Sequence, residues 1–280
     1  MKLAKLAHEK GIPVVSYIAP SAWAWHKSRA KNVAKIVDRV ACIFPFEYDV
    51  YKEAGAKVEF VGHPLVDIVK PSMTINEANA FAGKKEGRKL ILLMPGSRLM
   101  EIEKMLPTLL EAAKIIQEQL PEVDFVMPRA GTIPLNLLEE KIQASGLDVR
   151  ITEGHNYDLF SVADLALATS GTVTLEAALC GLGSVIVYRT NPLTYMIAKL
   201  VVNIPHIGLP NIVAGRSVVP ELIQNDFTPA KVAKAAMELL ESERNALMKK
   251  DLEYVKERLG KPGAVGRVAE LVLKIAGEKR

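Results

Sequence analysis

The sequence predicts an α/β protein built from doubly wound parallel sheets. Short apolar runs, each of the length that a buried parallel strand needs, alternate with helical segments along most of the chain. Glycine, proline and small polar residues separate these segments. A chain that alternates strand and helix in this way forms parallel sheets covered by helices.

The first part of the chain supplies three strands. Leu3, Leu6 and Ala7 form one face of a helix that stops at Gly11, and a strand over residues 13–18 follows. Further strands are expected over residues 39–44 and 58–61, with helices over 27–37 and 45–55. Because a helix precedes the first parallel strand, the sequence begins inside a βαβ unit, and we expect residues upstream of it.

The second part of the chain is more regular. Strands are expected over residues 89–93, 123–127, 149–151, 165–168 and 184–188. Helices are expected after residue 98 and over residues 135–144, 158–162, 173–179, 191–202 and 228–280, the last interrupted at 260–263. Residues 208–216 are expected to form a polar loop.

A polar, glycine-bearing stretch from Lys70 to Arg88 is the best candidate for a domain boundary. We therefore expect residues 1–70 to belong to an N-terminal domain and residues 71–256 to form a second domain. The C-terminal helix, residues 257–280, is expected to join the first.

Composition narrows the class of protein. With 49% hydrophobic and 24% charged residues over 280 positions, the chain can bury a large core. A net charge of +4 is too small to indicate a nucleic-acid partner, so none is expected. Cys42 and Cys180 lie in apolar runs and are expected to be reduced core residues, as in a cytoplasmic protein. No apolar run reaches the ~18 residues of a membrane span.

Common cofactor motifs are missing from the sequence. There is no G-x-x-x-x-G-K-[ST] loop and no G-x-G-x-x-G fingerprint between a strand and a helix. The five histidines do not have the spacing of a metal site, and no cluster of carboxylates suggests a divalent cation. The sequence therefore predicts neither a metal nor a cofactor.

The stretch from Ala163 to Leu179 is the most informative one. A short strand ends there, Ser170, Gly171 and Thr172 turn the chain, and a helix begins. The first N–H groups of a helix lack internal partners and attract phosphate, so this turn is a candidate phosphate site. Glu176, about one turn inside the helix, could accept hydrogen bonds from sugar hydroxyls. The alternative is an ordinary helix that is capped by the Ser170 or Thr172 side chain.

Polar residues follow other strands of the same domain. Ser97, Arg98 and Arg129 come directly after expected strands, and Asn211 lies in a later loop. Arginine and helix N-termini together stabilise a departing nucleoside diphosphate electrostatically. These residues, with the Ser170 turn and Glu176, compose a candidate nucleotide-sugar site without a metal.

A different group of residues indicates a surface for an anionic lipid or phosphate. Trp23 and Trp25 precede a helix that carries Lys27 and Arg29 among its basic residues. A solvated basic face is the competing interpretation. His63 follows a strand, where ligands bind in open α/β sheets, although a structural histidine is equally consistent with that position.

Six segments of the chain, in order, resemble the lipid-A-disaccharide synthase family. They are P-S-A-W-A-W-H-K-S-R at residues 20–29, P-F-E at 45–47, F-V-G-H-P-L-V-D at 60–67, M-P-G-S-R at 94–98, T-S-G-T-V-T-L-E at 169–176 and L-P-N-I-V-A-G-R at 209–216.

The resemblance implies an inverting, metal-independent glycosyltransferase with a GT-B architecture of two Rossmann-like domains, the N-terminal one incomplete here. The substrates would be UDP-2,3-diacylglucosamine and 2,3-diacylglucosamine 1-phosphate, and the products a tetraacyl disaccharide 1-phosphate and UDP. The reaction would take place at the cytoplasmic face of the inner membrane, to which the protein would bind peripherally. The resemblance leaves open whether the protein forms a homo-oligomer.

The resemblance also assigns roles to residues. It implies Arg98 and Glu176 as catalytic residues. The UDP-sugar would be bound by Ser97, Arg98, Ser170, Gly171, Thr172, Glu176, Asn211 and Arg216. The acceptor and membrane side would carry Trp23, Trp25, Lys27, Arg29 and His63.

The general base is the main departure from the family. The resemblance places a glycine-rich loop and an aspartate-bearing segment, proposed to supply the base, before the position that matches Met1. Within residues 1–67 only Glu47 and Asp67 are candidates for deprotonating the attacking hydroxyl. Two alternatives therefore stay open: a fragment that binds UDP-sugar without transferring it, and another GT-B enzyme acting on UDP-N-acetylglucosamine.

Overall fold

The computed structural model describes residues 2–19, 27–192, 194–196 and 205–278. The chain divides into two compact units. Unit 1 comprises Met1–Ile68, Tyr195–Pro205 and Lys256–Arg280, and unit 2 comprises Val69–Thr194 and His206–Val255.

Unit 1 contains a parallel sheet of three strands in the order β1-β2-β3. The strands are β1 (Val15–Tyr17), β2 (Arg39–Cys42) and β3 (Val58–Phe60), and the helices are α1 (Lys2–Glu9), α3 (Lys27–Ala34), α4 (Pro45–Glu53), α5 (Leu65–Ile68) and α15 (Ala264–Glu278). Apolar side chains of β2, α3 and α4 form its core, with Val40, Val33 and Tyr51 almost completely buried.

The last helix is held in unit 1 by two polar side chains. The Asp67 carboxylate accepts hydrogen bonds from the N–H groups of Gly263 (2.7 Å) and Ala264 (3.0 Å), at the start of α15. Arg267, one turn into that helix, donates to the carbonyl of Val61 at 2.8 Å. A carboxylate at a helix N-terminus is electrostatically favourable, so Asp67 both caps α15 and ties it to the chain after β3.

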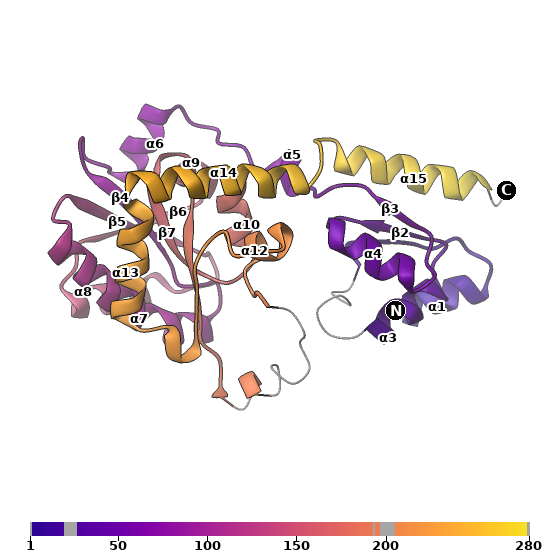
Figure 1. Cartoon of the computed structure of the whole chain (residues 1–280), viewed down its shortest axis with the longest axis horizontal. Coiled ribbons are helices and arrows are strands. Elements are labelled where there is room, and N and C mark those ends of the chain that lie inside the picture. The colour runs from indigo at the N-terminus through magenta and orange to yellow at the C-terminus, as the bar shows by residue number, and fades with distance from the viewer. Residues whose placement is uncertain (1, 20–26, 193, 197–204, 279–280) are drawn as a thin grey trace. The chain divides into compact units, whose positions relative to one another are not determined.

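Unit 2 is built on a parallel sheet of six strands in the order β6-β5-β4-β7-β8-β9 (Figure 1). The strands are β4 (Lys89–Met94), β5 (Val123–Arg129), β6 (Val149–Glu153), β7 (Leu165–Thr169), β8 (Ser184–Tyr188) and β9 (Glu221–Ile223). The helices are α6 (Ile75–Ala82), α7 (Leu99–Gln119), α8 (Leu135–Ser145), α9 (Asn156–Val162), α10 (Thr172–Leu179), α12 (Leu209–Ala214), α13 (Pro229–Leu240) and α14 (Ser242–Arg258), with a short 3-10 helix over Gln224–Asp226.

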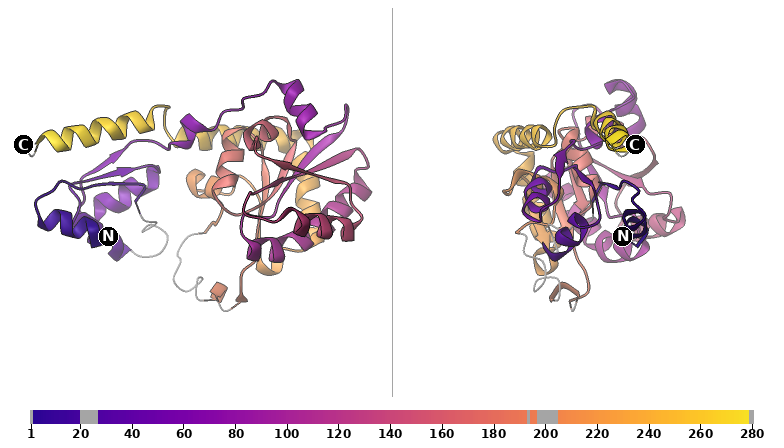
Figure 2. Two further views of the ribbon diagram at one scale, coloured as in Figure 1. Left: turned by 180° about the vertical axis from the view of Figure 1, so that it is seen from behind. Right: turned by 90° about the vertical axis from the view of Figure 1, so that its right-hand side faces the viewer.

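Helices cover both faces of this sheet, as the views from two sides show (Figure 2). Successive side chains of a strand point to opposite faces, so Ile91 and Leu93 pack with α7, α8 and α13, whereas Leu90 and Leu92 pack with α6, α9 and α10. All four side chains are fully buried. The continuous apolar runs in the sequence are therefore strands that are buried on both faces.

The order of the strands creates a crevice in the middle of the sheet. From β4 the chain proceeds to β5 and β6 on one side, and then returns to β7, β8 and β9 on the other side. The connections that leave β4 and β7 thus diverge, and parallel sheets bind ligands at the carboxyl ends of the strands at such a switch point.

The structure differs from the sequence-based expectation after β8. The expected loop over residues 208–216 contains the helix α12, and the strand β9, which was not expected, pairs with β8 beside it. Both elements are too short to have a clear periodicity, so contacts with the rest of the unit decide their conformation. The helix expected over residues 191–202 lies largely outside the described residues.

Candidate functional site

A cavity of about 410 Å³ opens at the switch point of the unit 2 sheet. It lies at the carboxyl ends of β4, β5 and β7, which are neighbours in the sheet. Its polar and charged lining comes from Ser97, Arg98, Glu101, Arg129, Asn156, Thr169, Ser170, Thr172 and Glu176, with Gly96 and Gly171 among the other lining residues. Of the residues predicted for the donor site, the structure thus brings Ser97, Arg98, Ser170, Gly171, Thr172 and Glu176 together.

The N-terminus of α10 faces this cavity without a side-chain cap. Gly171 occupies the N-cap position, and no side chain accepts a hydrogen bond there. The Ser170 hydroxyl donates instead to the carbonyl of Ile207 at 3.0 Å, and Thr174 donates back to Gly171. The alternative of a helix capped by Ser170 or Thr172 is therefore wrong. The first N–H groups of α10 are left for water or for a ligand.

Glu101 organises the turn that leads from β4 into α7. Its carboxylate accepts hydrogen bonds from the N–H groups of Ser97 (2.8 Å) and Arg98 (3.2 Å). The same carboxylate binds the Arg98 guanidinium at 2.6 Å, although the Arg98 side chain is 76% exposed. The sequence reasoning missed this role, which the spacing of an acidic residue three positions after the N-cap Arg98 could have indicated. Arg98 is thus a tethered but accessible cation at the cavity.

Glu176 is a half-buried carboxylate in the cavity wall. Burial raises its pKa above the usual value of 4.5. Among the described residues no side chain or N–H group binds this carboxylate, whereas most buried polar groups have a partner. The position therefore suits a carboxylate that receives its hydrogen bonds from a ligand.

Glu176→Gln is expected to stabilise the free protein while weakening nucleotide binding. Folding raises the pKa of Glu176, so the folded protein favours the protonated carboxyl group. This contribution to the free energy of unfolding is fully present below pH 4.5 and is lost as the pH rises through the raised pKa. Glutamine is neutral at every pH and avoids that loss. The melting temperature of the variant should exceed that of the unaltered protein by about 1–3 °C at neutral pH. The two should converge as the pH falls toward 4.5 in a thermal unfolding series.

Glu238→Gln serves as the matched control, since that side chain is 51% exposed on α13. It should show no gain in melting temperature over the same pH range. A gain at Glu176 that persists unchanged at acidic pH would contradict burial of its charge as the cause.

Thr169 adds a second unsatisfied group to the cavity wall. Its hydroxyl is buried and has no hydrogen-bond partner among the described residues. Arg129, at the end of β5, is more constrained, since its guanidinium pairs with Glu153 and donates to the carbonyl of Ile133. Thr169 was not singled out in the sequence, although its place at the end of a strand is typical of binding residues.

The structure does not bring Asn211 or Arg216 to this cavity. Asn211 is fully buried, and its amide binds the N–H groups of Val218 and Val219, the carbonyl of Val219 and the carboxylate of Glu221. Arg216 forms an ion pair with Asp251 at 2.6 Å. The expectation that both line this cavity is thus corrected, because Asn211 is bound by residues 218, 219 and 221, a few positions later, and Arg216 is bound by Asp251.

The residues predicted for the acceptor side lie in unit 1. Trp23 and Trp25 lie outside the described residues, and of Lys27 only the backbone, at the start of α3, is described. Arg29 is exposed on that helix. His63 is buried, its Nδ1 accepts a hydrogen bond from the N–H of Leu65 at 3.1 Å, and burial lowers its pKa to about 4. At neutral pH His63 is therefore uncharged, as expected of a structural histidine.

Neither candidate for the general base is free to act as one. Glu47 is 2% exposed and accepts hydrogen bonds from the N–H groups of Ile43 and Phe44, both at 3.2 Å, at the start of α4. Asp67 accepts hydrogen bonds from the first N–H groups of α15. Both carboxylates stabilise helix N-termini, so the sequence-based suggestion that either one deprotonates an acceptor is corrected.

The described residues contain neither a membrane-spanning helix nor a cluster of metal-ligating side chains. No helix in that part of the chain is long and apolar enough to cross a bilayer. Within the same residues, no three His, Cys, Asp or Glu side chains gather as a metal site would require.

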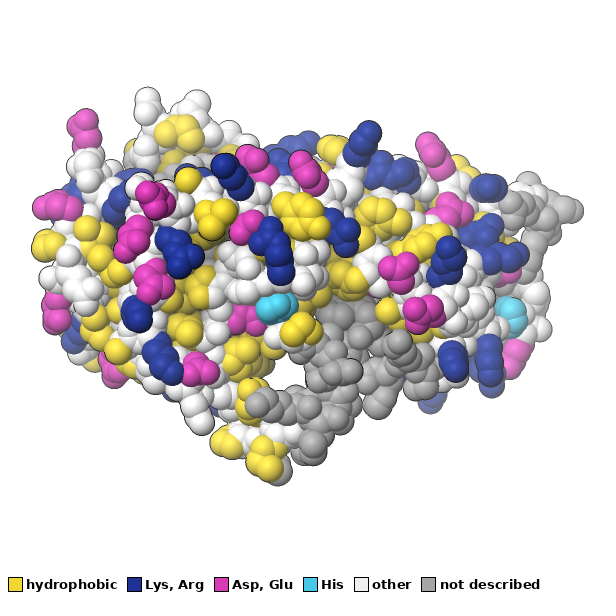
Figure 3. All heavy atoms as spheres, viewed as in Figure 1, with side chains coloured by type: hydrophobic (Ala, Val, Ile, Leu, Met, Phe, Trp, Pro, Cys, Tyr) yellow, Lys and Arg dark blue, Asp and Glu magenta, His cyan; other side chains and the backbone are white. Residues whose placement is uncertain are grey.

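On the face shown in Figure 3, basic and acidic side chains are interspersed along α13 and α14.

The solved structures that this chain resembles share its fold. One is a UDP-N-acetylglucosamine 2-epimerase from Neisseria meningitidis bound to UDP-GlcNAc, with a TM-score of 0.64 and 16% identity, covering 97% of this chain and 72% of that one. Another is a glycosyltransferase from Rickettsia africae, with a TM-score of 0.57 and 12% identity, covering 99% of this chain and 79% of that one. These similarities establish a GT-B-like α/β fold with parallel sheets.

Similarity in sequence is much closer to one family. The family model for lipid-A-disaccharide synthetase matches residues 1–275. The lipid-A-disaccharide synthase of Geobacter sulfurreducens is 43% identical over 280 residues, which are 100% of this chain and 73% of that protein. The enzyme of the same name from Nitrosococcus oceani is 41% identical over 98% of this chain and 70% of its own length. The chain therefore belongs to the lipid-A-disaccharide synthase family of glycosyltransferases.

Proposed function

We propose that this chain acts in lipid A biosynthesis by binding a UDP-sugar in the cavity at the β4–β7 switch point and transferring the sugar to a lipid acceptor. The donor is UDP-2,3-diacylglucosamine and the acceptor is 2,3-diacylglucosamine 1-phosphate. The observation that carries the proposal is the convergence of Arg98, the uncapped start of α10 and the unpartnered Glu176 carboxylate on one cavity. A ligand that carries both an anionic group and hydroxyl groups can bind all three: the anion binds Arg98 and the start of α10, and the hydroxyl groups bind Glu176.

The reaction requires stabilisation of a leaving group. The 6-hydroxyl of the acceptor attacks the anomeric carbon of the donor from the face opposite the diphosphate, and the carbon–oxygen bond to UDP breaks. The hydroxyl proton passes to a base, and the electron pair leaves with UDP. Arg98 and the N–H groups of Thr172 and Val173 offset the negative charge that develops on the diphosphate. Glu176 accepts hydrogen bonds from sugar hydroxyls of the nucleotide, which orients it.

The acyl chains of both substrates place the reaction at a membrane surface. We therefore propose that the protein binds peripherally to the cytoplasmic face of the inner membrane, with Trp23, Trp25, Lys27 and Arg29 on the side that faces the lipid. Tryptophan rings partition into the interface, and basic side chains are attracted to anionic lipids.

The proposal is tested by measuring two properties of one sample. Binding of UDP is followed by calorimetry, and formation of the disaccharide is followed with radiolabelled acceptor in mixed micelles. We expect saturable UDP binding and a product that depends on both substrates. Arg98→Ala should reduce both signals.

Each result has a separate meaning. UDP binding without any product supports the alternative of a UDP-sugar-binding fragment and contradicts transferase activity of this chain. Absence of UDP binding contradicts the donor site itself. A product from UDP-N-acetylglucosamine alone would favour another GT-B activity.

A further inference from the structure

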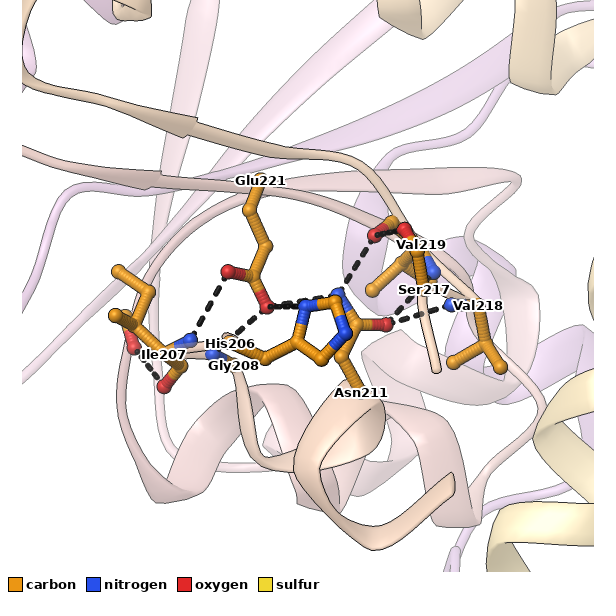
Figure 4. Close-up of polar contacts among 9 residues, drawn as sticks. His206, Ile207, Gly208, Asn211, Ser217, Val218, Val219 and Glu221 are labelled. Atoms are coloured by element: carbon orange, nitrogen blue, oxygen red, sulfur yellow. Dashed lines mark hydrogen bonds and ion pairs between the residues drawn. The ribbon is translucent and has the colours of Figure 1, made fainter. Parts of the chain in front are cut away.

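Glu221 lies at the centre of a buried network beside the candidate donor site (Figure 4). One carboxylate oxygen accepts a hydrogen bond from the N–H of Ile207 (3.0 Å). The other accepts from the N–H of Gly208 (3.0 Å) and from the Asn211 amide (2.7 Å). The Glu221 side chain is 9% exposed, and His206 Nδ1 lies 3.8 Å from it. The three residues 206–208, which precede α12, and Asn211 within that helix thus surround the Glu221 carboxylate.

This network reaches the cavity through Ser170. The carbonyl of Ile207, whose N–H is bound by Glu221, accepts the hydrogen bond of the Ser170 hydroxyl at 3.0 Å. Ser170 lines the cavity and directly precedes the N-cap of α10. The helix α12, which begins after Gly208, also packs against α10. Glu221 itself is not among the residues that line the cavity.

The fit around Gly208 shows how closely the segment is held. A Cβ atom at this position would lie 2.3 Å from Ile186 Cδ1 on β8 and 3.0 Å from a Glu221 carboxylate oxygen. The backbone therefore approaches both groups as closely as only glycine allows. The position of Ile207 is set by β8 on one side and by Glu221 on the other.

We infer that Glu221 is a positioning residue for nucleotide binding, which acts through Ile207 on Ser170 and the start of α10. This inference rests on the proposed donor site. Three N–H donors converge on the carboxylate, and glutamine has only one acceptor oxygen. In Glu221→Gln the new NH₂ group must face at least one of these donors, so the 206–211 segment shifts, and Ser170 shifts with it.

A double-mutant cycle on the full chain tests the inference, with UDP as the probe and its dissociation constant measured by calorimetry on folded samples. We expect Glu221→Gln to weaken UDP binding about tenfold in the unaltered background, within the range of coupled neighbouring residues. In the Ser170→Ala background the same substitution should cost less than about threefold, because the link to Ile207 is already absent. Glu238→Gln, exposed on α13, should change UDP affinity in neither background.

The outcomes separate this inference from the proposed function. If the unaltered chain binds UDP and Glu221→Gln binds it equally well, or weakens it equally in both backgrounds, the inference is overturned while the donor site stands. If the unaltered chain does not bind UDP, both are overturned.

A second measurement applies if Glu221→Gln does not fold. Hydrogen exchange of the peptide that contains residues 206–211 is compared in the unaltered protein with and without UDP. We expect UDP to slow exchange of the Ile207 and Gly208 amides, and an unchanged rate overturns the inference.

Discussion

Arg98→Ala is expected to weaken UDP binding about 30-fold, the loss that corresponds to about 2 kcal/mol for a hydrogen bond to a charged group. Arg98 lies in the turn between β4 and α7, in the wall of the cavity, and its guanidinium is accessible. In the free protein it is bound by Glu101, which holds it near the start of α10 without burying it. Calorimetry with UDP measures the effect directly.

Arg216→Ala is the matched control for this substitution. Arg216 belongs to the same unit and is also partly exposed, but it pairs with Asp251 and does not line the cavity. Its removal should leave UDP affinity within about twofold of the original. Arg98→Lys should recover part of the lost affinity, since it restores the charge but not the planar pair of donors. An equal loss at Arg98 and Arg216 would contradict the position of the donor site.

Asp158→Ala is expected to lower the free energy of unfolding by about 3 kcal/mol, since it removes a buried carboxylate that accepts three hydrogen bonds. Asp158 is 2% exposed. It accepts hydrogen bonds from the N–H groups of Ser72 (2.6 Å) and Met73 (2.7 Å) and from the Ser72 hydroxyl (3.0 Å), and it lies 3.2 Å from His155. These bonds fix the chain where it enters unit 2, just before α6 packs against α9. Denaturant unfolding measures the loss.

The effect of Asp158→Ala on the free energy of unfolding depends on pH. Burial alone would raise the pKa of Asp158, but its hydrogen bonds, mainly from Met73 and Ser72, outweigh burial and lower that pKa below 3.8. The stability that the carboxylate contributes is therefore present above pH 3.8 and is lost as the pH falls through the lowered value. The difference between Asp158→Ala and the unaltered protein should shrink in acid. Asp148→Ala, at an exposed position before β6, should stay within about 0.5 kcal/mol throughout.

Much of the lining of the candidate donor site could be predicted, because it depends on the ends of strands. The apolar runs that end at Met94 and Thr169 identify two strands of a parallel sheet, and the carboxyl ends of such strands share one edge. The residues that follow them, Arg98 and Ser170, are therefore on the same side of the sheet whatever the order of the strands. The family resemblance added the identity of the ligand.

The placement of Asn211, Arg216 and Glu221 could not be predicted in this way. Asn211 and Arg216 occur in a segment that resembles the family, yet their side chains are bound within the protein. The partner of Arg216 lies 35 positions away in the sequence, and Ile207 lies 37 positions from Ser170. Local patterns carry no information about contacts at such separations.

The sequence by itself determined the alternation of buried strands and covering helices, because the period of apolar residues is a local property of the chain. It also determined that Ser170 and Gly171 lie between a strand and a helix, which begins at Thr172. Only the tertiary structure decided that β4 and β7 are neighbours, that α10 starts without a side-chain cap and that Glu221 on β9 binds the N–H groups of Ile207 and Gly208. Strand order and buried hydrogen bonds join segments far apart in the chain, and their free energy depends on packing that exists only in the folded protein.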